Sequence, residues 1–79
     1  MKLKIRYFAN LREEANVSEE IIETNANIAQ DVYHELKEKY NFSLDSSFIK
    51  LSLNQKYAGL NSPLSEGDEL VFIPPVAGG

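Results

Sequence analysis

The chain lacks cysteine and tryptophan, and it has one histidine and one methionine among its 79 residues. Without cysteine there is no disulfide, thiolate nucleophile, iron–sulfur cluster or thiolate zinc site. The single histidine, His34, has no second histidine or cysteine with which to share a metal ion, so we expect no metal site. Any chemistry must therefore use groups other than thiol or imidazole side chains.

Positive charge is also scarce, because 8 lysine and arginine residues face 12 aspartate and glutamate residues and the net charge is −4. Nucleic-acid binding depends on basic side chains that contact phosphates, so we expect no nucleic-acid partner. No stretch reaches the roughly 18 apolar residues of a membrane span, and the start of the chain lacks the apolar core of a signal peptide. We expect a soluble, cytoplasmic protein with no membrane partner and one domain over residues 1–79.

Several segments have the pattern of a β-strand. Residues 2–8 and 49–53 alternate apolar and polar side chains, and residues 69–73 are a dense run of strand formers. Residues 18–24 contain adjacent isoleucines that cannot both face inward, which predicts a strand near an edge of the sheet. Asn54 and Gln55 predict a turn that leads into a short strand at residues 57–58.

One long helix is indicated between Asn27 and Asn41. Its apolar residues recur with helical spacing, with Asn27 and Gln30 as a capping box and Asn41 as a left-handed stop. A second capping box, formed by Asn10 and Glu13, predicts a short helical turn after the first strand.

This order of elements predicts an α+β fold, a mixed sheet of four to five strands with one main helix on one face and a short helical turn after the first strand. The last strand most simply lies beside the first in the centre of the sheet, which is the ubiquitin-like β-grasp arrangement. The predicted core consists of Leu3, Ile5, Tyr7, Ile28, Val32, Leu36, Ile49, Leu51, Leu53, Leu70 and Phe72.

The last six residues cannot contribute to a core, and we expect a flexible tail over residues 74–79. Proline favours extended backbone, and glycine has no β-carbon, so such a tail can enter a channel too narrow for other residues. The tail presents the α-carboxylate of Gly79. A carboxylate is not an electrophile until it is activated, typically by adenylation in a partner enzyme.

Four stretches carry a resemblance to a known family: residues 6–9, residues 11–13, residues 53–55, and the run from Leu64 to Gly79. With them the chain resembles the small subunit of molybdopterin synthase, a ubiquitin-like sulfur carrier, along essentially its whole length. The resemblance implies that an E1-like enzyme adenylates Gly79, which follows Gly78, and that the carboxylate becomes a thiocarboxylate. That thiocarboxylate then donates sulfur to cyclic pyranopterin monophosphate in molybdenum cofactor biosynthesis.

The resemblance also implies the partners and cofactors. The large catalytic subunit of the synthase receives the tail and forms a heterotetramer with this chain, and the E1-like adenylating enzyme binds ATP. This chain binds no cofactor itself.

A docking surface is predicted beside the tail. The parity of the strands places Phe8, Val71 and Ile73 on the sheet face away from the helix, as an exposed apolar patch. The resemblance adds Tyr57 to the contacts and places Arg12 nearby. The tail itself supplies the remaining partner-binding residues, Pro74, Pro75, Val76 and Ala77.

Two alternative functions remain open at this point. The first is a related sulfur carrier for thiamine, tungsten-pterin or tRNA thiolation. The second is a ubiquitin-like adaptor that binds through its apolar patch and is never activated at its terminus.

Overall fold

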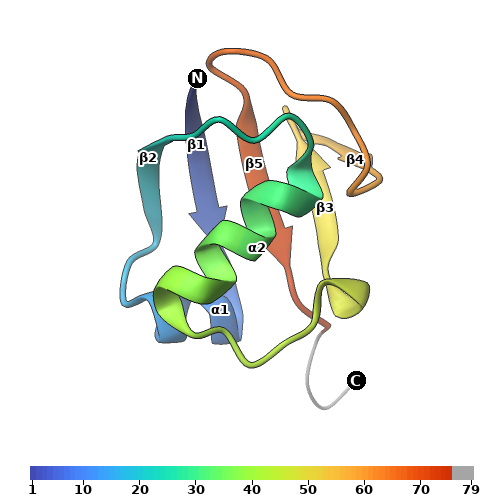
Figure 1. Cartoon of the computed structure of the whole chain (residues 1–79). Helices are drawn as coiled ribbons and strands as arrows, with labels where there is room; N and C mark the ends of the chain where they lie inside the picture. The colour runs from blue at the N-terminus through green and yellow to red at the C-terminus, as the bar shows by residue number, and fades with distance from the viewer. Residues whose placement is uncertain (76–79) are drawn as a thin grey trace.

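A five-stranded mixed sheet with one long helix across one face forms the structure (Figure 1). The computed structural model describes residues 1–75, so Val76, Ala77, Gly78 and Gly79 lie outside the described residues. The elements are β1 (Lys2–Tyr7), α1 (Ala9–Ala15), β2 (Glu19–Glu23), α2 (Ala29–Tyr40), η1 (Ser46–Phe48), β3 (Lys50–Leu53), β4 (Lys56–Ala58) and β5 (Glu69–Ile73).

The strand order is β2-β1-β5-β3-β4, with β1 and β5 parallel in the centre and the other pairs antiparallel. This confirms the ubiquitin-like β-grasp prediction, including the central position of the last strand. It also confirms β2 as an edge strand, on which Ile21 is 66% exposed and Ile22 is half-buried. No helix within residues 1–75 has the length and apolarity that crossing a bilayer requires.

The core lies between α2 and the sheet. Nine of the eleven predicted core residues are buried, whereas Ile28 and Leu53 are half-buried because they sit at the start of α2 and at the end of β3. Phe42, just after α2, is a core residue that the sequence patterns miss. Its ring lies 5.6–5.8 Å from those of Tyr7, Tyr33 and Tyr40.

The predicted capping boxes are wrong. α2 begins after Ile28 rather than Asn27, and its first amides, those of Ala29 and Gln30, donate hydrogen bonds to the carbonyls of Ser62 and Leu60. A distant loop thus satisfies the donors that a capping side chain normally satisfies.

At α1 the N-cap is Phe8, which gives no side-chain cap, and Asn10 lies inside the helix. The predicted stop of α2 is confirmed, because Asn41 adopts φ 58° and ψ 47°.

The turn between β3 and β4 is tied to the start of β5. Asn54 and Gln55 have φ of 51° and 72°, as a two-residue hairpin turn requires. The side-chain amide nitrogen of Asn54 donates a 3.0 Å hydrogen bond to the Asp68 carboxylate. The side-chain oxygen of Asn54 accepts a 3.0 Å hydrogen bond from the backbone N–H of Glu69. These contacts fix the first residue of β5, Glu69, to the turn between β3 and β4.

Candidate partner-docking site

The sheet face opposite to α2 carries a row of paired residues that crosses all five strands. From β4 to β2 the row runs Tyr57, Ser52, Val71, Arg6 and Glu19, each opposite the next. Side chains of one paired row point to the same face of the sheet. On this face, Tyr57 and Val71 make the row apolar toward β4, and Arg6 and Glu19 make it charged toward β2.

The apolar end of this face is hollowed into a shallow depression of about 220 Å³. We call it the docking depression, and it is lined by Phe8, Ser52, Gln55, Tyr57, Val71 and Ile73. The structure thus brings together the four apolar residues that were predicted to share this face.

The lining residues differ in exposure. Tyr57 is 82% exposed and Phe8 45%, whereas Ile73 is half-buried. Val71 is 7% exposed, so its predicted exposure is wrong. It lies on the central strand with its neighbours on both sides, and it forms the floor of the depression instead of a contact at its rim.

Phe8 reaches the depression because the backbone stays extended for one residue beyond β1. Its φ of −121° and ψ of 153° are those of a strand, and the chain then turns at Ala9, where φ is 48°. Since Tyr7 pairs with Phe72, Phe8, the residue after β1, comes beside Ile73, the last residue of β5.

The predicted tail leaves the domain beside the docking depression. Pro74 follows Ile73 and is buried, whereas Pro75 is exposed, so the chain leaves the packed domain at Pro75. The other predicted tail contacts, Val76 and Ala77, and the predicted reactive residues Gly78 and Gly79 lie outside the described residues.

Arg12, which was expected near this surface, is exposed on α1 and is not among the residues that line the depression. Ser52 and Gln55 line it but were not predicted, because their place depends on the register of β3 against β5 and β4. Only a signal that reports strand register could have found them.

Charged residues bound the docking depression on the side of β1 and β2. The Lys4 ammonium lies 3.8 Å from Glu19 and 4.0 Å from Glu69, and the Arg6 guanidinium lies 3.7 Å from Glu19. Such exposed pairs stabilise a fold by no more than about 1 kcal/mol each. Their main effect is to confine the apolar surface to the half of the sheet next to the tail.

Glu20 on β2 and Tyr7 on β1 both have a perturbed pKa. Burial alone raises the pKa of Glu20, but hydrogen bonds from Tyr40 and Tyr7 outweigh it and hold this pKa below its usual value. Burial, followed by the Glu20 carboxylate, raises the pKa of Tyr7. This cluster joins β1, β2 and α2 and is structural.

No cluster of three metal-ligating side chains occurs within the part of the chain that the structure describes.

Comparisons with known proteins agree with this arrangement. The ThiS family matches residues 5–79. The molybdopterin synthase sulfur carrier subunit of Mycobacterium tuberculosis is 33% identical over 82 residues, a match that covers 100% of this chain and 99% of the relative.

Two solved structures extend the comparison. A complex of subunits 1 and 2 of the molybdopterin-converting factor from Helicobacter pylori contains a chain 29% identical to this one, with a TM-score of 0.68 and full coverage of both chains. The small archaeal modifier protein 1 of Methanosarcina acetivorans is 26% identical, with a TM-score of 0.78 and coverage of 99% of this chain and 96% of that one.

Proposed function

The chain belongs to the ThiS family, and on that premise we propose that it is the sulfur carrier subunit of a molybdopterin synthase. The proposed reactive group is the C-terminal carboxylate of Gly79. The proposed partners are an E1-like adenylating enzyme, which loads the sulfur, and the large catalytic subunit, which receives it. The proposed location of all three is the cytoplasm.

The proposed loading of sulfur onto Gly79 has two steps. The Gly79 carboxylate attacks the α-phosphate of ATP in the activating enzyme, which forms an acyl-adenylate and releases pyrophosphate. A hydrosulfide ion from the sulfur source then attacks the acyl carbon and displaces AMP, and loss of the S–H proton leaves a thiocarboxylate. This chain supplies the carboxylate and a narrow approach through Gly78, whereas the activating enzyme binds ATP and this chain binds no cofactor.

The docking depression is the observation that carries the proposal. Phe8, Tyr57 and Ile73 surround an apolar hollow at the end of β5, from which the chain continues toward Gly79. An exposed apolar surface with a charged border is typical of a protein interface. The Helicobacter pylori relative has been solved in complex with a second subunit, which supports a second subunit as the partner of this chain.

The direct test is the intact mass of the chain after incubation with its activating enzyme, ATP and a sulfur source. The expected result is a mass increase equal to the replacement of one oxygen by sulfur, located in the C-terminal residue. A matched chain that lacks Gly78 and Gly79 should stay unchanged. An unchanged wild-type mass, with an enzyme that loads another carrier in the same experiment, contradicts the proposal.

A second candidate is a related carrier or modifier, favoured by the similarity to the archaeal modifier protein. It shares the activation of Gly79 but differs in the acceptor. The loaded chain should therefore be offered cyclic pyranopterin monophosphate with the large subunit. Dithiolene formation supports the synthase, whereas a loaded chain that transfers no sulfur to the pterin supports another acceptor.

A further inference from the structure

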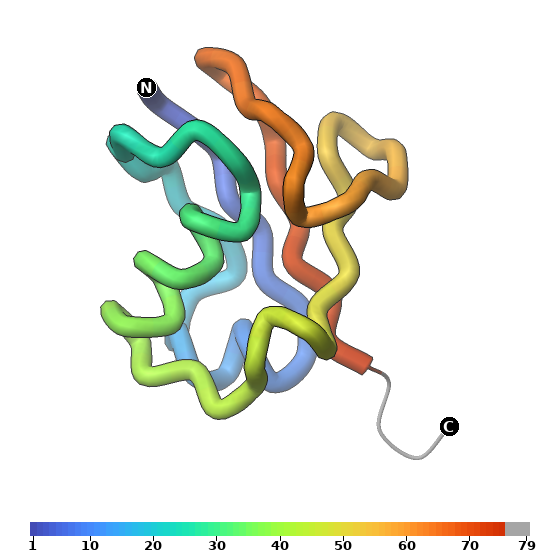
Figure 2. The backbone as a smooth tube through the Cα atoms, turned by 45° about the vertical axis from the view of Figure 1, so that its right-hand side comes forward, coloured from blue at the N-terminus to red at the C-terminus, as the bar shows by residue number. Residues whose placement is uncertain are grey.

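Phe48 is exposed at the end of the molecule where the chain leaves β5. The antiparallel pairing of β3 with β5 ends at Lys50 opposite Ile73. Two residues further along each strand are Phe48 and Pro75, and both are exposed. Figures 1 and 2 both place the short turn of η1, in yellow-green, beside the end of β5.

The base of the tail thus lies between two exposed phenylalanines. β5 is flanked by β1 on one side and by β3 on the other. Phe8 follows β1, and Phe48 precedes β3 and is 59% exposed. Phe48 is outside the hydrophobic core formed by the described residues, so its ring is available to another protein.

The length of chain beyond Pro75 determines how near a partner must come. Four residues separate Pro75 from the end of the sequence, and four residues span at most about 14 Å even when fully extended. A protein that encloses Gly79 in its active site must therefore bring the mouth of that site against the base of the tail. Residues on both sides of the base, and not only Phe8, are then within its contact area.

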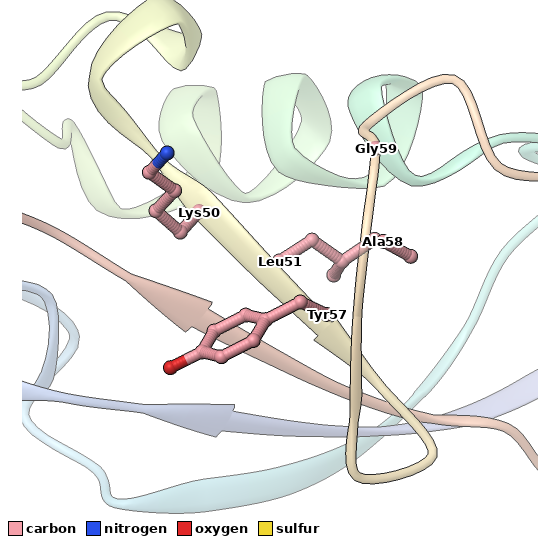
Figure 3. A pocket seen from close by; sticks show the side chains of 5 residues that line it. All are labelled: Lys50, Leu51, Tyr57, Ala58 and Gly59. Carbon is pink, nitrogen blue, oxygen red and sulfur yellow. The ribbon is translucent and has the colours of Figure 1, made fainter.

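A second hollow shares Tyr57 with the docking depression. A hollow of about 530 Å³ at the edge of β3 and β4 is lined by Lys50, Leu51, Tyr57, Ala58 and Gly59 (Figure 3). One of its lining residues, Lys50, is two residues along the chain from Phe48. Tyr57 lines both this hollow and the docking depression. A partner seated on Tyr57 can therefore follow this hollow as far as Lys50, which is two residues along the chain from Phe48.

We infer that Phe48 is a further aromatic contact for the large subunit, in addition to Phe8 and Tyr57, on the side of the tail opposite to Phe8. This inference rests on the proposed function, because it takes the large subunit as the protein that encloses the tail. Buried aromatic side chains contribute a large share of the affinity of many interfaces. Isolated exposed apolar residues are common on proteins, so the position of Phe48 at the tail, and not its exposure alone, carries the inference.

The test compares Phe48→Ser with Ile21→Ser in the full-length chain. Ile21 is 66% exposed, slightly more than Phe48, but it lies on β2, at the far edge of the sheet from β3. Isothermal calorimetry with the large subunit should show a Kd about tenfold higher for Phe48→Ser, and a Kd within twofold of wild type for Ile21→Ser. Thermal unfolding of both variants checks that each is folded.

A rise of less than fivefold for Phe48→Ser, or an equal rise for Ile21→Ser, overturns the inference. Phe8→Ser in the same titration distinguishes a failure of the inference about Phe48 from a failure of the proposed function. If Phe8→Ser weakens binding and Phe48→Ser does not, the inference fails and the proposed function stands. If the wild-type chain does not bind the large subunit, both fail.

Discussion

The hydroxyl of Tyr7 donates a 2.7 Å hydrogen bond to the Glu20 carboxylate and so ties β1 to β2. The hydroxyl of Tyr40 donates a second hydrogen bond, of 2.6 Å, to the same oxygen, which adds α2 to the link. The Lys39 ammonium lies 3.7 Å from the other carboxylate oxygen. One charged group therefore holds three elements at the edge of the fold.

Glu20→Gln should lower the free energy of unfolding at pH 7 by about 1–2 kcal/mol, because two hydrogen bonds to a charged acceptor become weaker. The folded-state pKa of Glu20 lies below its usual value of 4.5. Its carboxylate therefore stabilises the fold above that value, and the contribution is lost as the pH falls through the folded-state pKa. Urea unfolding at a series of pH values measures the difference in free energy of unfolding between the wild type and Glu20→Gln. This difference should become smaller in acid. Glu38→Gln, an exposed change on α2, should show neither effect.

Phe42→Ala should destabilise the fold by about 3–5 kcal/mol, because it removes a ring that is 2% exposed and packs against three tyrosines. Phe48→Ala is the matched control and should change the free energy of unfolding by no more than about 0.5 kcal/mol, since that ring is largely exposed. Denaturant unfolding of both variants makes the comparison. Equal losses contradict the burial described for Phe42.

Phe8→Asp should raise the Kd for the large subunit at least tenfold, because binding then buries a carboxylate in an apolar depression with no partner for it. The fold should persist, since Phe8 is partly exposed and caps no amide with its side chain. Calorimetric titration gives the Kd, and Ile21→Asp at the far edge serves as control. Unaltered binding of Phe8→Asp means that the docking depression is not the interface.

Extension of the chain by a few residues past Gly79 should abolish sulfur transfer and leave the thermal midpoint unchanged. The extension removes the free carboxylate and adds side chains that a narrow channel cannot admit, whereas Pro75, the last described residue, is already outside the packed domain. A pterin sulfuration assay and a thermal scan measure the two effects. Retained transfer by the extended chain contradicts the assignment of Gly79.

The sequence predicts which face of the sheet a residue occupies, because parity within a strand is a local property. Phe8 and Ile73 could be placed together from that parity and the expected pairing of the first and last strands. The burial of Val71 could not, because it depends on neighbours that β1 and β3 supply from distant parts of the chain.

The errors at the helix starts have a similar cause. The amides of Ala29 and Gln30 are satisfied by carbonyls about thirty residues later in the chain, and no local motif reports such contacts. Phe42 was missed for another reason. It lies in a loop, outside any periodic segment, so nothing in its immediate sequence indicates that it fills the space between three rings.

The central position of β5 means that the sheet is closed by the last of the described strands along the chain. β5 is the last strand to be made, yet it joins β1 and β2 on one side to β3 and β4 on the other. Until it emerges from the ribosome the two halves of the sheet have no strand between them, and the core stays open. The same strand leads into Pro74, so the base of the tail takes its place only when the two halves of the sheet have joined.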